Sequence, residues 1–147
     1  AVALFQGDLY VTGSLTEIGG LNGINYIARW NGTQWQKLGN GLPGTMSHGW
    51  ALCVYNDKLY VGGSFMVAGN IPVNNIATWD GTQWDSVASP PSSLAIDGTV
   101  HAFVVDTVKN LLYVGGSFTR GVVSWDSTAY GIYTEKFSAY RKMLIVH

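Results

Sequence analysis

Three histidines are the side chains best suited to proton transfer or metal binding, and they lie far apart in the chain. His48 stands two residues before Trp50, His101 stands two residues before Phe103, and His147 is the last residue. We therefore predict that His48 and His101 occupy equivalent positions, where a ring of imidazoles could bind a metal or an anion. No zinc-type spacing accompanies them, which favours a simpler interpretation: both occupy a junction between a loop and a strand through repetition of the sequence.

Other common catalytic motifs do not occur in the sequence. There is no serine-nucleophile elbow and no pair of catalytic carboxylates, and the GGSF segment at 62–65 lacks the lysine and spacing of a phosphate-binding loop. Asn31-Gly32-Thr33 is a formal N-glycosylation sequon. Because Asp80 takes the corresponding place further along, turn chemistry alone also explains the asparagine. We predict no catalytic, cofactor-binding or metal-binding residue, and Asn31 as a candidate glycosylation site.

Two stretches rich in Gly, Asn and apolar residues, 16–25 and 66–74, are predicted to be long loops between strands. They could form a recognition surface for a protein or a glycan, with Tyr26 or Trp50 as an aromatic platform. The candidate interaction residues are Ile18, Asn22, Tyr26, Trp50, Asn70 and Ile71. In the alternative interpretation, Ile18 and Ile71 pack under a sheet edge and the asparagines cap turns.

The elements that must position these residues are repeats. LYVGGSF occurs at 59–65 and again at 112–118, and LYVTGSL at 9–15 is a near copy. Downstream of the first two copies along the chain, IARWNGTQW at 27–35 recurs as IATWDGTQW at 76–84. Such self-similarity is the signature of a repeat architecture, in which each repeat is one supersecondary unit.

Each repeat is predicted to contain four antiparallel strands. Apolar and β-branched runs are separated by turn residues, and Asn31-Gly32 and Asp80-Gly81 are strong hairpin signals between the third and fourth strands. In the third repeat, Asp126-Ser127 replaces Asp-Gly and Tyr130 stands where the second tryptophan is expected. The expected strands are 1–5, 8–15, 25–30 and 34–38, then 50–55, 58–65, 74–79 and 83–87, then 100–106, 110–118 and 122–125.

Four-stranded units of this length predict an all-β fold made of β-propeller blades. The predicted blades are 1–48, 49–98 and 99–136, and residues 137–147 begin a fourth, which gives about three and a half blades. A closed ring typically needs about four to eight blades, so the predicted ring is incomplete. Two interpretations remain: the chain is a piece of a longer protein, which we favour, or it closes through other chains.

The repeats resemble the kelch repeat, and most closely the kelch-like propellers of secreted and cell-surface proteins. The resemblance covers residues 1–126 well and the remainder loosely, and Thr12 breaks the first glycine pair. It implies that the glycines and tryptophans of the motif are structural. These residues are Gly62, Gly63, Gly115, Gly116, Trp30, Trp35, Trp79 and Trp84.

Galactose oxidase-like enzymes share this type of propeller and use copper with a tyrosine–cysteine crosslink, which draws attention to Cys53, Tyr55 and Tyr60. Cys53 is the only cysteine, and Ala3 occupies its place in the first repeat. A position that accepts alanine is typical of a packed core, so we expect Cys53 to be buried and structural.

Composition limits the remaining classes of function. Of the 147 residues 47% are hydrophobic and 12% charged, and the net charge of −1 predicts no nucleic-acid binding. No apolar run is long enough for a membrane span. We predict a non-enzymatic extracellular or cell-surface module that binds an unknown protein or glycan, or packs with remaining blades or further copies of the chain. The alternatives are the propeller part of a secreted enzyme with its active site elsewhere, and a self-assembling structural unit.

Overall fold

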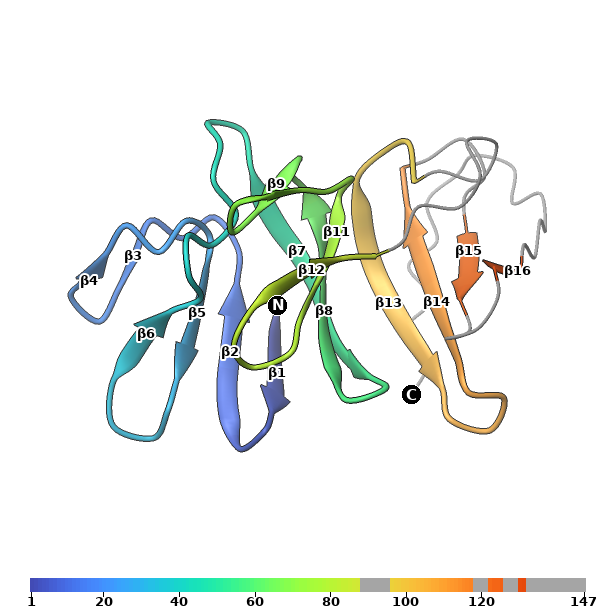
Figure 1. Ribbon diagram of the computed structural model, residues 1–147, viewed down its shortest axis with the longest axis horizontal. Coiled ribbons are helices and arrows are strands. Elements are labelled where there is room, and N and C mark those ends of the chain that lie inside the picture. Colours follow the sequence, from blue (N-terminus) through green and yellow to red (C-terminus); the bar gives the residue numbers. More distant parts are fainter. Residues whose placement is uncertain (88–95, 118–121, 126–129, 132–147) are drawn as a thin grey trace.

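The structure is a computed structural model that describes residues 1–87, 96–117, 122–125 and 130–131. Within these ranges the chain forms only β-strands and connecting turns, and no helix occurs (Figure 1). Every strand pair between them is antiparallel. The predicted all-β class is therefore confirmed. The predicted fourth unit at 137–147 lies outside the described residues.

Three four-stranded sheets follow one another along the chain, and in each the strands lie side by side in sequence order. The first sheet contains β1 (Val2–Phe5), β2 (Asp8–Thr12), β5 (Ile27–Trp30) and β6 (Trp35–Lys37). The second contains β7 (His48–Tyr55), β8 (Lys58–Ser64), β11 (Ile76–Trp79) and β12 (Trp84–Ser86). The third contains β13 (Val100–Asp106), β14 (Leu111–Gly116), β15 (Val122–Trp125) and β16 (Tyr130–Gly131).

The strand register confirms the predicted correspondence between repeats. Trp30 pairs with Trp35 in the first sheet and Trp79 pairs with Trp84 in the second. Tyr130 takes the place of the second tryptophan in the third sheet, since it pairs with Trp125. β7 begins at His48, two residues before the start of the expected strand at 50–55.

The predicted loops 16–25 and 66–74 each contain a small two-stranded ribbon, which corrects the sequence-based expectation. The ribbons are β3 (Glu17–Ile18) with β4 (Leu21–Asn22), and β9 (Val67–Ala68) with β10 (Ile71–Pro72). Gly19 and Gly69 take positive φ angles of 53° and 60° in their turns, which glycine adopts without strain. A Cβ on Gly69 would lie 2.6 Å from Trp84 Cδ1, so each ribbon folds closely over the fourth strand of its own sheet.

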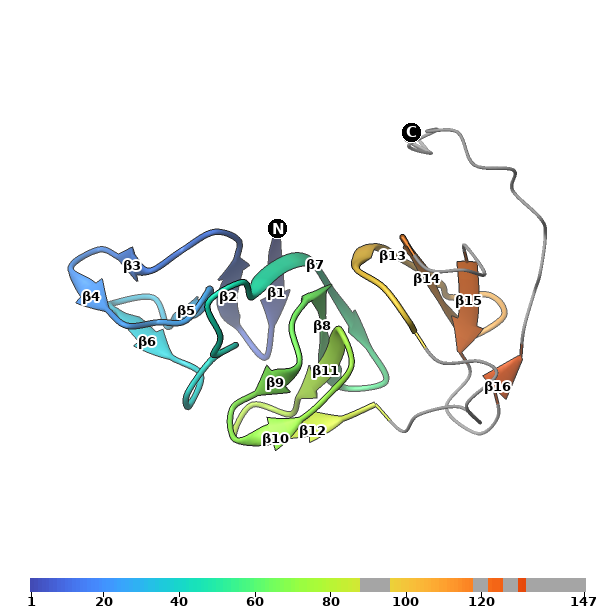
Figure 2. The same ribbon diagram turned by 90° about the horizontal axis from the view of Figure 1, so that it is seen from above.

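The first strands of the three sheets are neighbours. β7 contacts β1 on one side and β13 on the other. Figure 2 shows the three sheets as a fan, with β1, β7 and β13 towards one side and β6 and β12 away from it. The second sheet is therefore covered on both faces, whereas the first is covered on one.

Two apolar cores fill the junctions between sheets. Alternation along β11 divides its side chains between them: Ala77 and Trp79 join the core between the first and second sheets, and Ile76 joins the core between the second and third. All four residues of this strand are buried, because both faces of its sheet are covered.

The Gly62-Gly63 pair allows neighbouring parts of the chain to approach closely. A Cβ on Gly63 would overlap the carbonyl oxygen of His48 in the adjacent strand, and a Cβ on Gly62 would overlap Val100 of the third sheet. A β-bulge lies opposite the pair, between Gly49 and Ala51. The pair therefore serves both packing within the sheet and packing between sheets.

Candidate functional site

A β-bulge in β7 makes Trp50 an extra residue that has no partner in the neighbouring strand. Gly49 pairs with Gly63 and Ala51 pairs with Gly62, so Trp50 lies between two paired positions. Its side chain is 47% exposed. Bulges redirect side chains and are frequent beside binding sites, and this one directs a large indole ring away from the cores.

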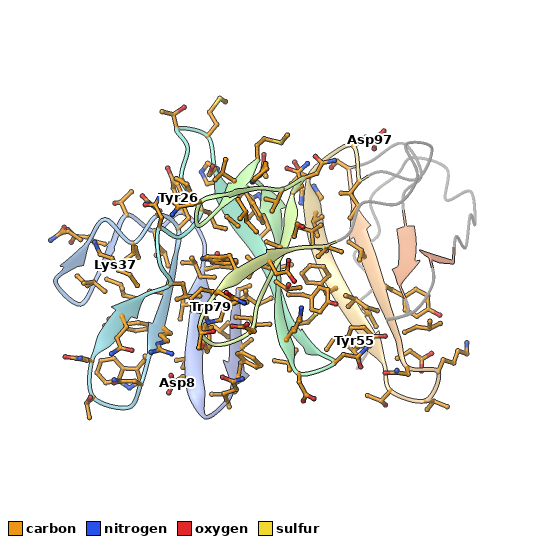
Figure 3. The ribbon with its side chains drawn as sticks, in the orientation of Figure 1. Asp8, Tyr26, Lys37, Tyr55, Trp79 and Asp97 are labelled. Atoms are coloured by element: carbon orange, nitrogen blue, oxygen red, sulfur yellow. The ribbon has the colours of Figure 1, made fainter. Side chains whose placement is uncertain are left out.

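Trp50 belongs to a row of three aromatic rings, which we call the aromatic cluster: Tyr26, His48 and Trp50. The rings of His48 and Trp50 are stacked, with centroids 5.6 Å apart and planes 15° from parallel. The Tyr26 ring lies 5.4 Å from the His48 ring on a tilted plane. The cluster joins the first and second sheets, with Tyr26 at their upper end in Figure 3. The sequence proposed Tyr26 or Trp50 separately; the structure brings them together through His48.

The backbone of Tyr26 is left-handed, with φ of 69°, which is uncommon for a bulky residue. Three hydrogen bonds hold it there. Its N–H donates to the Leu15 carbonyl at 2.8 Å, and its carbonyl accepts from Gly13 N at 3.2 Å and from Thr12 Oγ1 at 2.7 Å. The surrounding chain therefore imposes the conformation that places the Tyr26 ring against His48.

Asn75 is the counterpart of Tyr26 in the second sheet and has φ of 63°. Its main chain makes the same contacts, to Phe65 O at 2.8 Å and from Gly63 N at 3.0 Å. Its side chain turns inward, where Oδ1 accepts from Phe65 N at 3.0 Å. Asparagine tolerates left-handed backbone, so this repeat has the residue that the position favours. The first repeat has instead a tyrosine that contributes to the aromatic cluster.

The remaining predicted interaction residues lie in the ribbons and do not join the cluster. Asn22 is exposed in β4 and its Nδ2 donates to the Gly20 carbonyl at 3.3 Å. The β3–β4 ribbon lies at the far end of the first sheet from β7 (Figure 1). In both ribbons the predicted isoleucine is half-buried and the predicted asparagine is exposed. The isoleucines are Ile18 and Ile71, and the asparagines are Asn22 and Asn70.

The register corrects the predicted equivalence of His48 and His101. Ala102 pairs with Gly115 as Ala51 pairs with Gly62, so His101 lies at the bulge of β13 in the position of Trp50. Its Nε2 lies 2.7 Å from Ser117 Oγ. The error arose because the turn between β13 and β14 has four residues, 107–110, where the turn between β7 and β8 has two, so counting back from the LYV segment is shifted by two. Within the described ranges, no group of three His, Cys, Asp or Glu side chains is placed to hold a metal, and His147 lies outside those ranges.

Cys53 packs beside the core between the second and third sheets, opposite Tyr60 in the register of β7 and β8. Burial raises the pKa of its thiol to about 12, so the thiol is neutral. The hydroxyl of Tyr55 donates to the Asn110 carbonyl at 2.8 Å. Tyr55 is therefore a core side chain, whereas Cys53 is half-buried and packs against the margin of that core.

Asn31 and Asp80 make the same turn in successive repeats. Asn31 Oδ1 accepts from Thr33 N at 3.0 Å and from Gln34 N at 2.9 Å. Asp80 Oδ1 accepts from the equivalent N–H groups of Thr82 and Gln83 at 2.8 and 2.9 Å. Hydrogen bonds from Gln83 and then Thr82 lower the pKa of Asp80 to about 2. Turn chemistry thus accounts for both residues, and Asn31 is exposed.

A shallow hollow beside the outer strand of the second sheet is lined by Pro72, Val73, Asn74, Ser86 and Val87. The described residues that line it include no acidic, basic or thiol side chain. The aromatic cluster is therefore the more distinctive surface of the described residues, since it combines an exposed indole, an imidazole and two unusual backbone conformations.

No protein-family model matches the chain, and no curated protein matches it. No helix of the described residues is long and apolar enough to cross a membrane. The function is accordingly inferred from the geometry of the sheets and of the aromatic cluster.

Proposed function

We propose that the chain is a segment of a kelch-like β-propeller that acts outside the cell or at its surface as a non-enzymatic binding module. Its repeated four-stranded antiparallel sheets support the propeller assignment, as do their neighbouring first strands and diverging outer strands (Figure 2). The aromatic cluster is the proposed contact surface for the partner.

The observation that carries this proposal is the convergence of two backbone irregularities on His48. Tyr26 reaches His48 from a left-handed residue and Trp50 reaches it from a β-bulge. A left-handed backbone at a residue other than glycine costs about 1–3 kcal/mol, and a β-bulge interrupts the hydrogen bonds between two strands. Both features are frequent at functional sites. The Tyr26 side chain also packs against the core between the first and second sheets, but the fold does not require a tyrosine there, because the second repeat places Asn75 at the same position.

A protein is the partner that this surface suits best. Tyr and Trp are enriched among the residues that dominate binding energy at protein interfaces. Met46, two residues before His48, is 81% exposed and adds a flexible apolar side chain. A glycan is the second candidate, because the near-parallel rings of His48 and Trp50 offer a flat surface for the apolar face of a sugar.

The extracellular assignment rests on the resemblance of the repeats to kelch-like propellers of secreted and cell-surface proteins, and the sequon at Asn31, on an exposed turn, provides a way to test it. Production in a eukaryotic secretory host should add a glycan that an endoglycosidase removes. Asn31→Asp is a matched control, because Asp80 makes the same turn with a carboxylate. An unmodified wild-type chain secreted by that host would contradict glycosylation at Asn31.

Binding should be tested with two variants that copy residues from the chain itself. Trp50→His introduces the residue found at the next bulge, and Tyr26→Asn introduces the residue found in the next repeat. Candidate partners from chemical crosslinking, and a glycan array, would be measured against both variants and the wild-type chain. We expect the partner to bind the wild type and to lose about ten-fold or more in affinity with either variant. Equal affinity for all three chains would contradict the proposal.

A further inference from the structure

The first sheet has an apolar face that points away from the rest of the molecule. Along β1 and β2, Val2 pairs with Val11 and Leu4 pairs with Leu9, which puts all four side chains on one face. Val2 is 66% exposed and Leu4 is 73% exposed. We call this surface the outward face; it consists of Val2, Leu4, Leu9, Val11, Trp30 and Trp35.

The second strand of the same face is buried in the other two sheets, although Val54, the counterpart of Leu4 in the second sheet, is 39% exposed. Leu59 and Val61 correspond to Leu9 and Val11, and both are 0% exposed in the core between the first and second sheets. Leu112 and Val114 correspond to them in the third sheet and are 0% and 2% exposed in the next core. The chain thus buries this face at each of its two junctions.

At each junction, the sheet that faces these leucines contributes a tyrosine. Tyr10 of the first sheet lies in the core that covers Leu59, and Tyr60 of the second sheet lies in the core that covers Leu112. These tyrosines are themselves equivalent, since each lies between the Leu and Val of an LYV segment. A leucine-bearing face therefore packs against the tyrosine-bearing face of the preceding sheet.

Polar groups fix the position of one sheet on the next. Trp84 Nε1 donates across the first junction to the Leu38 carbonyl at 2.8 Å, and Gly69 N donates to the Gly41 carbonyl at 2.7 Å. The equivalent groups in the first repeat are Trp35 Nε1 and Gly19 N. Neither has an acceptor among the residues that the structure describes.

We propose that the outward face binds the tyrosine-bearing face of a further four-stranded repeat, placed as the first sheet is placed on the second. The occupant carries a tyrosine in the position of Tyr10, and after its fourth strand a glycine turn like residues 38–42. Backbone carbonyls of that turn accept hydrogen bonds from Trp35 and Gly19. The equivalent apolar residues are buried at both junctions of this chain, and the equivalent donors form hydrogen bonds at the first, so a further repeat is the partner that fits this surface best.

A tandem chain tests this docking directly. A second copy of residues 1–50 is joined before Ala1, which reproduces the native Trp50–Ala51 connection because Ala1 corresponds to Ala51. Leu9→Cys in the original copy reports access to the outward face through its rate of alkylation. We expect alkylation to be about ten-fold or more slower in the tandem chain than in the 147-residue chain with the same substitution.

A matched variant guards against indirect effects. Tyr10→Lys in the added copy alone removes the complementary side chain and should return the alkylation rate to that of the 147-residue chain. Equal alkylation rates in the tandem and single chains would overturn the proposal. They would show that the added sheet, although joined to the same chain, does not cover the outward face. Protection that survives Tyr10→Lys would also overturn it. Partner binding at the aromatic cluster is a separate measurement, so either proposal can fail alone.

Discussion

Thr12 and Gly49 fit together across the junction of the first and second sheets. A Cβ on Gly49 would overlap Thr12 Oγ1 and lie 2.9 Å from Thr12 Cβ. At the next junction the sizes are exchanged: Gly62 takes the place of Thr12, and Val100 takes the place of Gly49. A large residue thus faces a glycine at both junctions, with the glycine on opposite sides.

This complementarity predicts a measurable coupling between the two positions. Gly49→Val should lower the free energy of unfolding by about 1–3 kcal/mol, because the added side chain overlaps Thr12. Adding Thr12→Gly should recover part of that loss, although Thr12 Oγ1 no longer donates to Tyr26. A double-mutant cycle by urea unfolding should give a favourable coupling of about 1–2 kcal/mol. Additive effects would refute the proposed fit.

Two equivalent glycines should respond differently to the same substitution. Gly62→Ala places a methyl group against Val100 and within 2.7 Å of Phe103 Cζ, and should destabilise the protein by about 1–3 kcal/mol. Among the described residues, the methyl group of Gly115→Ala meets nothing closer than Ala102 O at 3.9 Å, so the substitution should change stability by about 0.5 kcal/mol or less. Thermal and urea unfolding check both variants. An equal loss in the two would mean that the Gly62 contact across the junction is unimportant.

Tyr26→Asn should be tolerated better than Tyr26→Ala. Asparagine suits the left-handed backbone and can accept from Leu15 N, as Asn75 accepts from Phe65 N. We expect the free energy of unfolding to stay within about 1 kcal/mol of the wild type for asparagine. Tyr26→Ala removes the packing of the ring and does not gain the hydrogen bond from Leu15 N. It should therefore lower the free energy of unfolding by about 2 kcal/mol or more. The reverse order in urea unfolding would contradict the role assigned to the position.

Asp80 should make stability depend on pH in the acid range. Its folded pKa of about 2 lies below the ordinary 3.8, so its contribution is fully present above pH 3.8 and is lost as pH falls through about 2. Asp80→Asn keeps the turn, as Asn31 shows, but does not titrate. Urea midpoints measured between about pH 4 and pH 2 should therefore fall less steeply in the variant. Parallel slopes would show that the turn does not stabilise the charged form.

Cys53 should resist alkylation in the folded protein. Its pKa of about 12, against an ordinary 9.0, lowers the thiolate fraction at neutral pH by roughly a thousand-fold. Iodoacetamide at about pH 8 should therefore modify Cys53 far more slowly in buffer than in urea. Met46→Cys supplies the exposed comparison, and mass spectrometry distinguishes the two sites. Comparable rates for both thiols in the folded protein would contradict the burial of Cys53.

Turn chemistry and alternation made the main strands predictable from the sequence. Asn31-Gly32 and Asp80-Gly81 lie at the hairpins between third and fourth strands, and β11 divides its side chains as alternation requires. The ribbons β3–β4 and β9–β10 were missed because their two-residue strands are too short to show a period. Their glycine turns were the available signal.

The aromatic cluster was predictable only in part. Tyr26 and Trp50 are visible as aromatic residues near loops, but their meeting at His48 depends on a bulge and on a junction between sheets. Counting residues from the repeats assigned His101 to the wrong partner because the turn between β13 and β14 is two residues longer than the turn between β7 and β8. Thr12 stood out as a break in a glycine pair, and its explanation at Gly49 lies far along the chain.

The bulge that displays Trp50 recurs in β13 with His101 at the same position. Its residue has no partner in the adjacent strand and lies outside both cores, so its identity is not constrained by how the sheets pack. The second sheet has an indole ring at this position and the third has an imidazole ring. The edge of this protein can consequently acquire a new binding chemistry one repeat at a time, by single substitutions that leave the sheet junctions as they are.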